Sequence, residues 1–444
     1  MAIIVMRKSP SPRAAIHTHG CRLNQSESVL LRERLRAEGY EVVPWGEPAD
    51  LGIINTCTVT REAEAKCRQT IRGFQRTNPD AFTAVVGCYS QTGAKALAEI
   101  PGVDLIVGNQ EKLSVLDYIG EERNPHPVIV RERIDREDFS IAFVGDTPFQ
   151  QRANLKIQDG CDFFCSFCII PMARGRARSR HWDNLLAEAE NLVARGVREL
   201  VLTGVNLGTY LDHGRDIVAV VDALDKIPGL NRVRISSIEP TTVPLPLLER
   251  MADTGHTLMP FLHLPLQSGC NRILQEMRRR YTVHDYEAFV DEAMGRVPDL
   301  CLGTDILVGF PGETDEEFAQ TCRFFEQLPF AYTHVFTYSE RDGTLAARRQ
   351  GEMIPVPKRN RRGAKLRRLS AIRQREFHRS HLGQVSEVLF EDPKEGGWPG
   401  LTRNYIRVRV ESPENLRNRR ALVRLDHVAA DFVEGTLIEV LDPA

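Results

Sequence analysis

The stretch that decides the fold is Gln158-Asp-Gly-Cys-Asp-Phe-Phe-Cys-Ser-Phe-Cys-Ile-Ile-Pro171, which contains a C-x3-C-x2-C triplet. Three thiolates so close in sequence cannot pair off as disulfides without leaving one over, so they indicate one metal centre. A structural zinc ion usually takes four protein ligands, and the next histidine, His181, lies beyond a run of arginines. Three cysteines on a four-iron cluster leave one iron open for a small molecule. We therefore expect Cys161, Cys165 and Cys168 to hold a metal centre, with a zinc knuckle or unrelated thiols as the alternatives.

Length and composition set the class of protein. The chain has 444 residues, enough for two or three domains, and its 42% hydrophobic and 27% charged residues are typical of a soluble protein. It contains no run of about 18 apolar residues, so we expect no membrane span. The N-terminus does not have the pattern of a signal peptide. Ten cysteines then indicate metal or redox chemistry in the cytoplasm rather than a disulfide framework.

Upstream of the triplet, a strand, a cysteine and a helix follow one another repeatedly. Strands are predicted at residues 14–20, 51–56, 82–87 and 104–108, and helices at 26–38 and 61–76. This alternation predicts βα units and a parallel sheet. Cys21, Cys57 and Cys88 each follow a strand, and the carboxyl ends of parallel strands lie at one edge of the sheet. We expect these thiols to converge on a second cluster, although small buried cysteines are also common in strands.

Both sets of cysteines resemble known sequences. The triplet spacing is that of the radical S-adenosylmethionine (SAM) enzymes, and residues 18–28, 55–60 and 86–89 are similar to the N-terminal domain of the radical-SAM methylthiotransferases. The resemblance implies a [4Fe-4S] cluster at the triplet, with SAM chelating its open iron. It also implies an auxiliary [4Fe-4S] cluster held by Cys21, Cys57 and Cys88. Cys67 matches no ligand position, so we expect a structural or surface thiol there.

The resemblance covers nearly the whole chain and implies an α/β protein of three domains. These are an N-terminal parallel βα domain at 13–120, a central partial (β/α)6 barrel with a basic helix at 148–378, and a small antiparallel β-barrel at 380–442; residues 121–147 are a predicted linker. Barrel strands are predicted at 152–159, 198–204, 232–238, 261–267, 300–308 and 332–338. Reactive groups in such barrels lie at the carboxyl ends of the strands.

Those strand ends carry the candidate SAM-binding groups. They are Thr203, Gly204, Ser236, Glu239 and Gln267, and Phe167 of the cluster loop joins them as an apolar cover. A glycine lets the backbone approach a ligand closely, and Glu239 has the chemistry to bond a ribose hydroxyl or the SAM ammonium group. The alternatives are ordinary βα turns, helix caps and packing. After the triplet, every second residue from 174 to 180 is an arginine, namely Arg174, Arg176, Arg178 and Arg180. In an extended segment these side chains lie on one side, and we expect that positively charged side to face the SAM carboxylate or RNA phosphate. A solvated loop is the alternative.

The C-terminal part changes character. Lys358 to His381 is predicted to be a basic amphipathic helix, followed by short strands at 383–390, 402–410, 420–425 and 435–440. This part resembles the TRAM domain, a five-stranded RNA-binding module. Arg403, Tyr405 and Arg407 are the candidate RNA contacts, through phosphate binding and base stacking. A purely structural barrel is the alternative.

The family attaches a methylthio group to an unactivated C–H carbon, which acid–base chemistry cannot reach. The resemblance implies tRNA as substrate and a one-electron reductant such as flavodoxin or ferredoxin as partner. Residues 20–25, 55–60, 68–72 and 334–344 most resemble the branch that acts on threonylcarbamoyladenosine, although Phe163, Phe164 and Met172 depart from its pattern. The other branches act on isopentenyladenosine in tRNA or on a ribosomal-protein aspartate. A radical-SAM RNA methylase and a non-catalytic RNA-binding protein with a structural metal are the remaining hypotheses.

Overall fold

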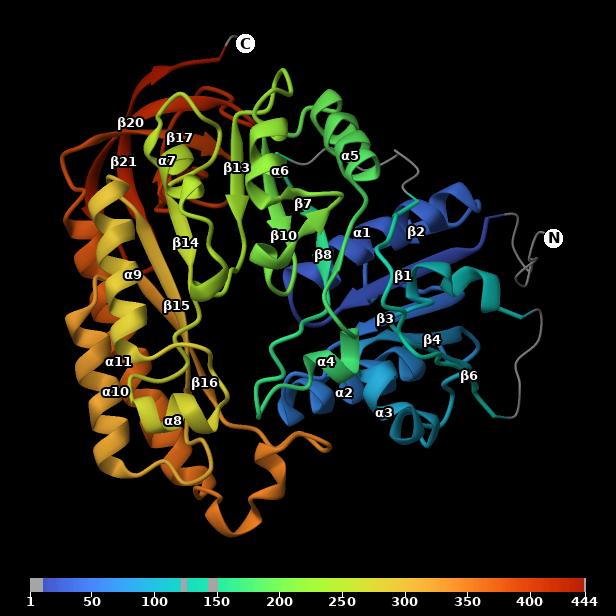
Figure 1. Cartoon of the computed structure of the whole chain (residues 1–444). Coiled ribbons are helices and arrows are strands. Elements are labelled where there is room, and N and C mark those ends of the chain that lie inside the picture. The colour runs from blue at the N-terminus through green and yellow to red at the C-terminus, as the bar shows by residue number, and fades with distance from the viewer. Residues whose placement is uncertain (1–10, 121–125, 143–150, 443–444) are drawn as a thin grey trace.

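The computed structural model describes residues 11–120, 126–142 and 151–442, which form three regions (Figure 1). A parallel α/β sheet is followed by a set of parallel βα units and then by a small closed β-barrel. None of the helices in these ranges combines the length and apolar composition that crossing a bilayer requires. The predicted three-part α/β organisation is confirmed.

The N-terminal region is a six-stranded parallel sheet in the order β2-β1-β3-β4-β5-β6. Its elements are β1 (Arg13–Thr18), α1 (Arg22–Ala37), β2 (Glu41–Val43), β3 (Leu51–Thr56), α2 (Arg61–Thr77), β4 (Phe82–Gly87), α3 (Cys88–Ala98), β5 (Leu105–Val107), the 3-10 helix η1 (Lys112–Tyr118) and β6 (Val128–Val130). Every residue of β3 and β4 is buried. Helices α1 and η1 cover one face and α2 and α3 the other, so these strands are apolar throughout.

Two strands of this sheet were not predicted. β2 and β6 have only three residues each and are partly exposed, so neither carries a clear apolar pattern. β6 pairs with β5 and lies within the predicted linker 121–147. That part of the linker therefore belongs to the N-terminal sheet.

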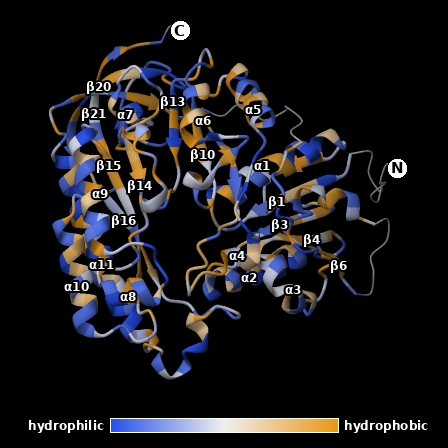
Figure 2. Ribbon diagram, in the orientation of Figure 1, coloured by the Kyte–Doolittle hydropathy of each residue, from blue (hydrophilic) through white to orange (hydrophobic). Residues whose placement is uncertain are grey.

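The central region contains six parallel strands in two triplets, β7-β10-β13 and β14-β15-β16. Its strands are β7 (Arg152–Lys156), β10 (Glu199–Thr203), β13 (Arg232–Ile235), β14 (Phe261–His263), β15 (Cys301–Val308) and β16 (Tyr332–Thr337), with α5 (Trp182–Ala194), α6 (Ile217–Leu224), α7 (Pro246–Ala252), α8 (Asn271–Glu276), α9 (Val283–Arg296) and α10 (Asp315–Gln327) between them. A bridge between Val233 and Leu258 joins the two triplets. In Figure 2 much of the α10 ribbon is blue, which marks hydrophilic residues. This arrangement is the predicted partial barrel.

The C-terminal region is a closed five-stranded barrel in the order β17-β18-β19-β21-β20. The strands are β17 (Val385–Phe390), β18 (Trp398–Thr402), β19 (Arg407–Val410), β20 (Arg420–Val428) and β21 (Val433–Val440). The β19–β21 pair is parallel, so the predicted fully antiparallel barrel is corrected at that pair. The predicted strand 402–410 is also corrected. Tyr405 has a left-handed φ of 70°, and a turn there separates β18 from β19.

Two buried arginines of β13 attach the C-terminal barrel to the central one. Arg232 donates from Nη1 to the carbonyl oxygen of Leu401 at 2.6 Å. Arg234 donates to the carbonyl oxygens of Thr402 and Arg403 at 2.8 and 2.7 Å, and its Nε to Glu199 Oε1 at 2.9 Å. Residues two apart on a strand point to the same face, so both guanidinium groups reach the end of β18. These contacts fix the β18–β19 turn against the central barrel.

The predicted basic helix is α11 (Val356–Arg379), and it packs along β16. Two of its arginines are buried in ion pairs. Arg359 Nη2 lies 2.6 Å from Glu340 Oε1, and Arg362 pairs with Glu313 and, at 2.8 Å, with Asp315. The inner face of α11 therefore joins parts of the barrel, while its other cations, such as Arg361 and Lys365, are exposed.

A buried charge network joins the N-terminal sheet to the central barrel. Glu27 of α1 contacts Lys156 Nζ at 2.8 Å and Arg174 Nη1 at 3.1 Å, and it also pairs with Lys112. Asp159 contacts Lys156 at 2.6 Å and Arg174 at 3.0 Å. Burial opposes ionisation of Glu27, but Arg174, Lys112 and Lys156 hold the pKa of Glu27 well below its usual value. Glu27 follows Cys21 by six residues and Asp159 precedes Cys161 by two, so this network fixes the two cysteine loops relative to each other.

Glu27→Gln is predicted to loosen this interface, because three buried cations lose a charged partner. We expect a loss of about 3 kcal/mol of stability at neutral pH, measured by the thermal midpoint and by proteolysis between the two domains. The control Glu62→Gln removes an exposed pair with Lys66 and is expected to cost under about 0.5 kcal/mol.

The pH dependence provides a second check on the same variant. Because the pKa of Glu27 is depressed in the folded protein, its contribution is complete above the unfolded pKa of about 4.3 and is lost as the pH falls. Wild type and Glu27→Gln should therefore converge in acid. Equal melting of Glu27→Gln and Glu62→Gln at neutral pH would contradict the role of the network.

Candidate active site

The loop of residues 161–168 is held by backbone contacts on both sides. It connects β8 (Gln158–Asp159) to α4 (Ile170–Arg174). The amide of Cys161 donates to the carbonyl of Gly175 at 3.1 Å, and the amide of Ser166 donates to the carbonyl of Met277 at 3.0 Å. Gly160 has φ 72°, and a Cβ there would lie 1.8 Å from the carbonyl oxygen of Arg176. Only glycine permits this close approach, and the approach fixes the position of the backbone just before Cys161.

The thiols of this loop lie in a buried, partly charged environment. Burial raises the pKa of Cys161 to about 11 and that of Cys168 to about 12. Arg279 Nη1 donates to Cys165 Sγ at 3.3 Å, and the same guanidinium pairs with Glu239. Arg279 was not predicted from the sequence, although it stands in a conspicuous run of three arginines at 278–280. It can support a thiolate at Cys165, because a nearby cation favours the charged form.

The second set of cysteines lies at one edge of the N-terminal sheet. Cys21, Cys57 and Cys88 follow β1, β3 and β4, which are neighbours in the sheet. A Cβ built on Gly20 would lie 3.1 Å from Cys57 Sγ, so the β1–α1 turn reaches Cys57. Burial raises the pKa of Cys57 to about 12, and the nearby Cys88 and Cys21 contribute. The strand ends therefore bring the three thiols together.

Cys67 lies beneath this site. It is fully buried, and its Sγ lies 3.5 Å from the amide nitrogen of Cys57 and 3.7 Å from the carbonyl oxygen of Cys57. Of the two expectations for Cys67, the structural thiol fits these contacts and the surface thiol does not.

The thiol donors bear on the kind of metal centre. In the described ranges, only His263, Asp305 and His334 place three ligand atoms within 4.8 Å of one another. Each cysteine set offers three thiol donors, the number that the family resemblance implies for a four-iron cluster with one open iron.

A cavity of about 700 Å³ lies where the three regions meet. Cys21 and Arg22 line it from the N-terminal sheet, and Tyr405 and Arg407 line it from the C-terminal barrel. The central barrel contributes the ends and inner faces of its strands. These wall residues include Gly204, Ser236, Phe261, His263, Asp305, Tyr332 and His334. Its volume suits a modified nucleobase or a ligand of similar size.

The predicted SAM-binding residues divide into two groups. Gly204 and Ser236 belong to the cavity wall, as expected for strand-end groups. The Thr203 side chain is buried away from the wall, Phe167 packs edge-on against Phe310 with ring centroids 6.5 Å apart, and Glu239 pairs with Arg279. Within the described ranges these three side chains do not line the cavity. Gln267 is also outside the wall, and its backbone has φ 68° and bridges to Ile306.

The prediction for the arginine run is wrong for three of its four members. Arg174 lies in the Glu27–Asp159 network, Arg180 is fully buried and pairs with Glu188, and Arg178 is buried beside the ring of Phe139. The cause is that residues 170–174 form a helix and the following segment runs inside the protein, where carboxylates offset the charges. Only Arg176 is exposed at the surface, 3.1 Å from Asp162. Arg176 is the one member of the run still available to RNA.

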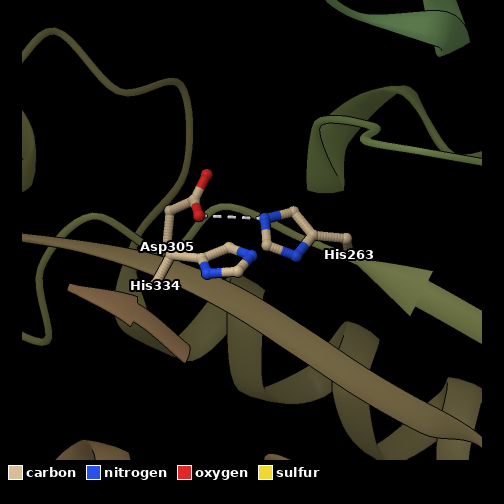
Figure 3. Close-up of side chains that lie close together, drawn as sticks. All are labelled: His263, Asp305 and His334. Atoms are coloured by element: carbon tan, nitrogen blue, oxygen red, sulfur yellow. Dashed lines mark ion pairs between the residues drawn. The ribbon is translucent and has the colours of Figure 1, made fainter. Parts of the chain in front are cut away.

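A hydrogen-bonded group inside the cavity was not assigned a role from the sequence. His263, Asp305 and His334 come from the adjacent strands β14, β15 and β16, and Figure 3 shows the Asp305 carboxylate beside the His263 ring with the His334 ring close by. His263 Nε2 lies 3.0 Å from Asp305 Oδ1, and its Nδ1 lies 3.0 Å from the hydroxyl of Tyr332. Such a group can orient a polar edge of a substrate or hold a proton.

Asp305→Asn is predicted to reduce turnover at this cavity by about tenfold or more, because His263 loses a charged hydrogen-bond partner. Product formation should fall while cofactor content stays the same. Asp222→Asn is the matched control, since Asp222 pairs with Arg250 outside the cavity. Equal activity in the two variants would remove this group from the site.

The cysteine assignment makes a separate prediction. A triple Cys21/Cys57/Cys88→Ala variant should lose about half of the bound iron and retain reductive cleavage of SAM, because the 161–168 loop is untouched. Iron content and 5′-deoxyadenosine production are the measurements. A variant that keeps all of its iron would contradict a second cluster.

Comparison with protein families and sequences gives two domain matches. The Radical SAM superfamily matches residues 155–325, and Uncharacterized protein family UPF0004 matches residues 13–108. The chain is 36% identical to the threonylcarbamoyladenosine tRNA methylthiotransferase MtaB of Bacillus subtilis, covering 96% of this chain and 97% of that protein. It is 34% identical to the tRNA-2-methylthio-N(6)-dimethylallyladenosine synthase of a Jannaschia species, covering 95% and 93%.

Among solved structures, the chain resembles the radical SAM methyltransferase TsrM from Kitasatospora setae. The TM-score is 0.56 at 18% identity, and the match covers 76% of this chain and 77% of that chain. At this identity the likeness establishes the fold and nothing about the substrate.

Proposed function

The chain belongs to the radical-SAM tRNA methylthiotransferases, and we propose that it adds a methylthio group to C2 of N6-threonylcarbamoyladenosine beside the anticodon of tRNA. The similarity to the Bacillus subtilis relative over nearly the full length of both chains carries this proposal. A relative from Aquifex aeolicus with the same name is also 36% identical, over 90% of this chain. The relative named for dimethylallyladenosine is only slightly less similar, so that base is the second candidate.

The enzyme uses SAM and two [4Fe-4S] clusters. We assign one cluster to Cys161, Cys165 and Cys168, and the other to Cys21, Cys57 and Cys88. When bound, these cofactors supply the radical that reaches an unactivated C–H carbon and the sulfur that replaces its hydrogen.

The protein's own residues provide placement and shielding. Gln158 connects the cluster loop to the segment that follows β10, because its Oε1 accepts from the amides of Val205 and Asn206 at 2.7 and 3.1 Å. Its Nε2 donates to the carbonyl of Gly160 at 2.9 Å. Phe163, which is buried, and Phe167 exclude water from the loop. The Glu27–Asp159 network holds the two sets of cysteines at a fixed distance from each other.

The C-terminal barrel contributes to the substrate side. Tyr405 and Arg407 lie in the cavity wall, which supports the expectation that they contact RNA near the target base. Arg403 is half-buried and its carbonyl is bound by Arg234, so we expect a smaller role for its side chain.

A one-electron reductant such as flavodoxin or ferredoxin completes the set of partners. We infer a cytoplasmic location, because the proposed substrate is a tRNA.

The proposal predicts a change in the nucleosides of cellular tRNA. Deleting the gene should abolish 2-methylthio-N6-threonylcarbamoyladenosine and lead its precursor to accumulate, measured by mass spectrometry of digested tRNA. Complementation with the wild-type gene should restore the product, and the Cys161/Cys165/Cys168→Ala variant should not. Loss of the methylthio-dimethylallyl nucleoside instead would identify the second candidate base.

A further inference from the structure

One cation in the cavity wall has no charged partner among the residues that the structure describes. Arg22 is the first residue of α1 and directly follows Cys21, so its side chain lies beside the proposed auxiliary cluster. Its Nη2 donates to the hydroxyl of Tyr405 at 2.9 Å. Across the three described ranges, Arg22 forms no ion pair with any carboxylate. An arginine in a cavity wall that has no carboxylate partner indicates an anionic ligand, because guanidinium groups bind carboxylates with charge-assisted, often bidentate hydrogen bonds.

The other arginines of the cavity wall are already engaged, and of its two carboxylates Asp431 is exposed and forms no ion pair among the described residues. Arg234 is bound by Glu199 and by two backbone carbonyls, and Asp305 by His263. Arg407 lies 3.7 Å from Glu391 and its side chain is 44% exposed. Arg22 is therefore the wall cation most available to a ligand. The N-terminal end of α1 adds a small positive potential at the same place.

The charge of Arg22 also reaches the histidine group. Burial lowers the pKa of His334 most, nearby His263 and Arg22 lower it further, and the Asp305 carboxylate opposes them. Arg22, Tyr405 and His334 all line the cavity, and the His334 ring and the Tyr405 hydroxyl are suited to hydrogen bonding with a ligand's polar groups.

The two candidate bases differ in the substituent on N6, the group that would lie near Arg22. In adenine, C2 and C6 are both bonded to N1, so a substituent on N6 lies on the same side of the ring as the reacting carbon. A residue next to Cys21 is therefore close to that substituent when C2 is presented to the auxiliary cluster. The threonylcarbamoyl group carries a carboxylate and a hydroxyl, whereas the dimethylallyl group is wholly apolar.

We propose that Arg22, oriented by the Tyr405 hydroxyl, binds the threonyl carboxylate and selects threonylcarbamoyladenosine over an adenosine with an apolar N6 group. This inference rests on the proposed function and names the specificity residue of the same site. A polar site rejects an apolar analogue because its buried polar groups would be left without partners.

The test compares three anticodon stem-loop RNAs that carry threonylcarbamoyladenosine, dimethylallyladenosine or plain adenosine at the target position. Affinity is measured by fluorescence anisotropy on the enzyme with both clusters reconstituted, and methylthio transfer on the same preparation. Arg22→Gln should weaken binding of the threonylcarbamoyl RNA by roughly ten- to a hundredfold, as expected for one charge-assisted contact. The other two RNAs should change by less than about twofold by the same reasoning. Arg22→Lys should recover part of the loss, and Tyr405→Phe should show an intermediate loss.

Arg296→Gln is the matched control, because Arg296 is exposed on α9 and pairs only with Glu292 among the described residues. Its binding should equal that of wild type. If Arg22→Gln weakens all three RNAs equally, Arg22 contacts the RNA backbone and the inference is overturned; no effect on any RNA overturns it as well. A wild-type enzyme that modifies only the dimethylallyl RNA would overturn the proposed function itself. The wild-type measurements therefore test the proposed function separately from the role of Arg22.

Discussion

The buried contact of Glu27 and Asp159 with Lys112, Lys156 and Arg174 is the constraint on which the site depends. Buried ion pairs contribute little net stability, since desolvation offsets most of their attraction. What they provide here is a defined distance and orientation between two domains. The network carries more positive than negative charge, and Cys88 and Cys21 are close enough to raise the pKa of Arg174. The surplus therefore faces the auxiliary cysteines, where thiolate ligands bring negative charge.

The cavity is a product of all three regions. The N-terminal sheet supplies Cys21, the central barrel supplies strand ends, and the β18–β19 turn supplies Tyr405. Separate attachments hold the two outer regions to the central barrel, with the charge network on one side and Arg232 and Arg234 on the other. The geometry of the cavity thus depends on residues that lie far from it in sequence.

Features that depend on local pattern could be predicted from the sequence. β3 and β4 coincide with apolar runs, and the cysteines that follow them lie at the strand ends as expected. Features that depend on tertiary contacts could not. The arginines at 174, 178 and 180 suggested an anion-binding surface, but carboxylates brought in by other elements bury them. The histidine group was also missed, because only the parallel register places Asp305 opposite His334 on the neighbouring strand.

The attachment of the C-terminal barrel has a consequence for biosynthesis. Arg232 and its acceptor, the carbonyl of Leu401, are 169 residues apart, so β13 leaves the ribosome long before the turn that completes the cavity. Until that turn arrives, two buried guanidinium groups of β13 lack their acceptors and the wall that carries Tyr405 is missing. A chain interrupted before β18 still contains all six proposed cluster cysteines but has no C-terminal wall, so we expect its cavity to be open.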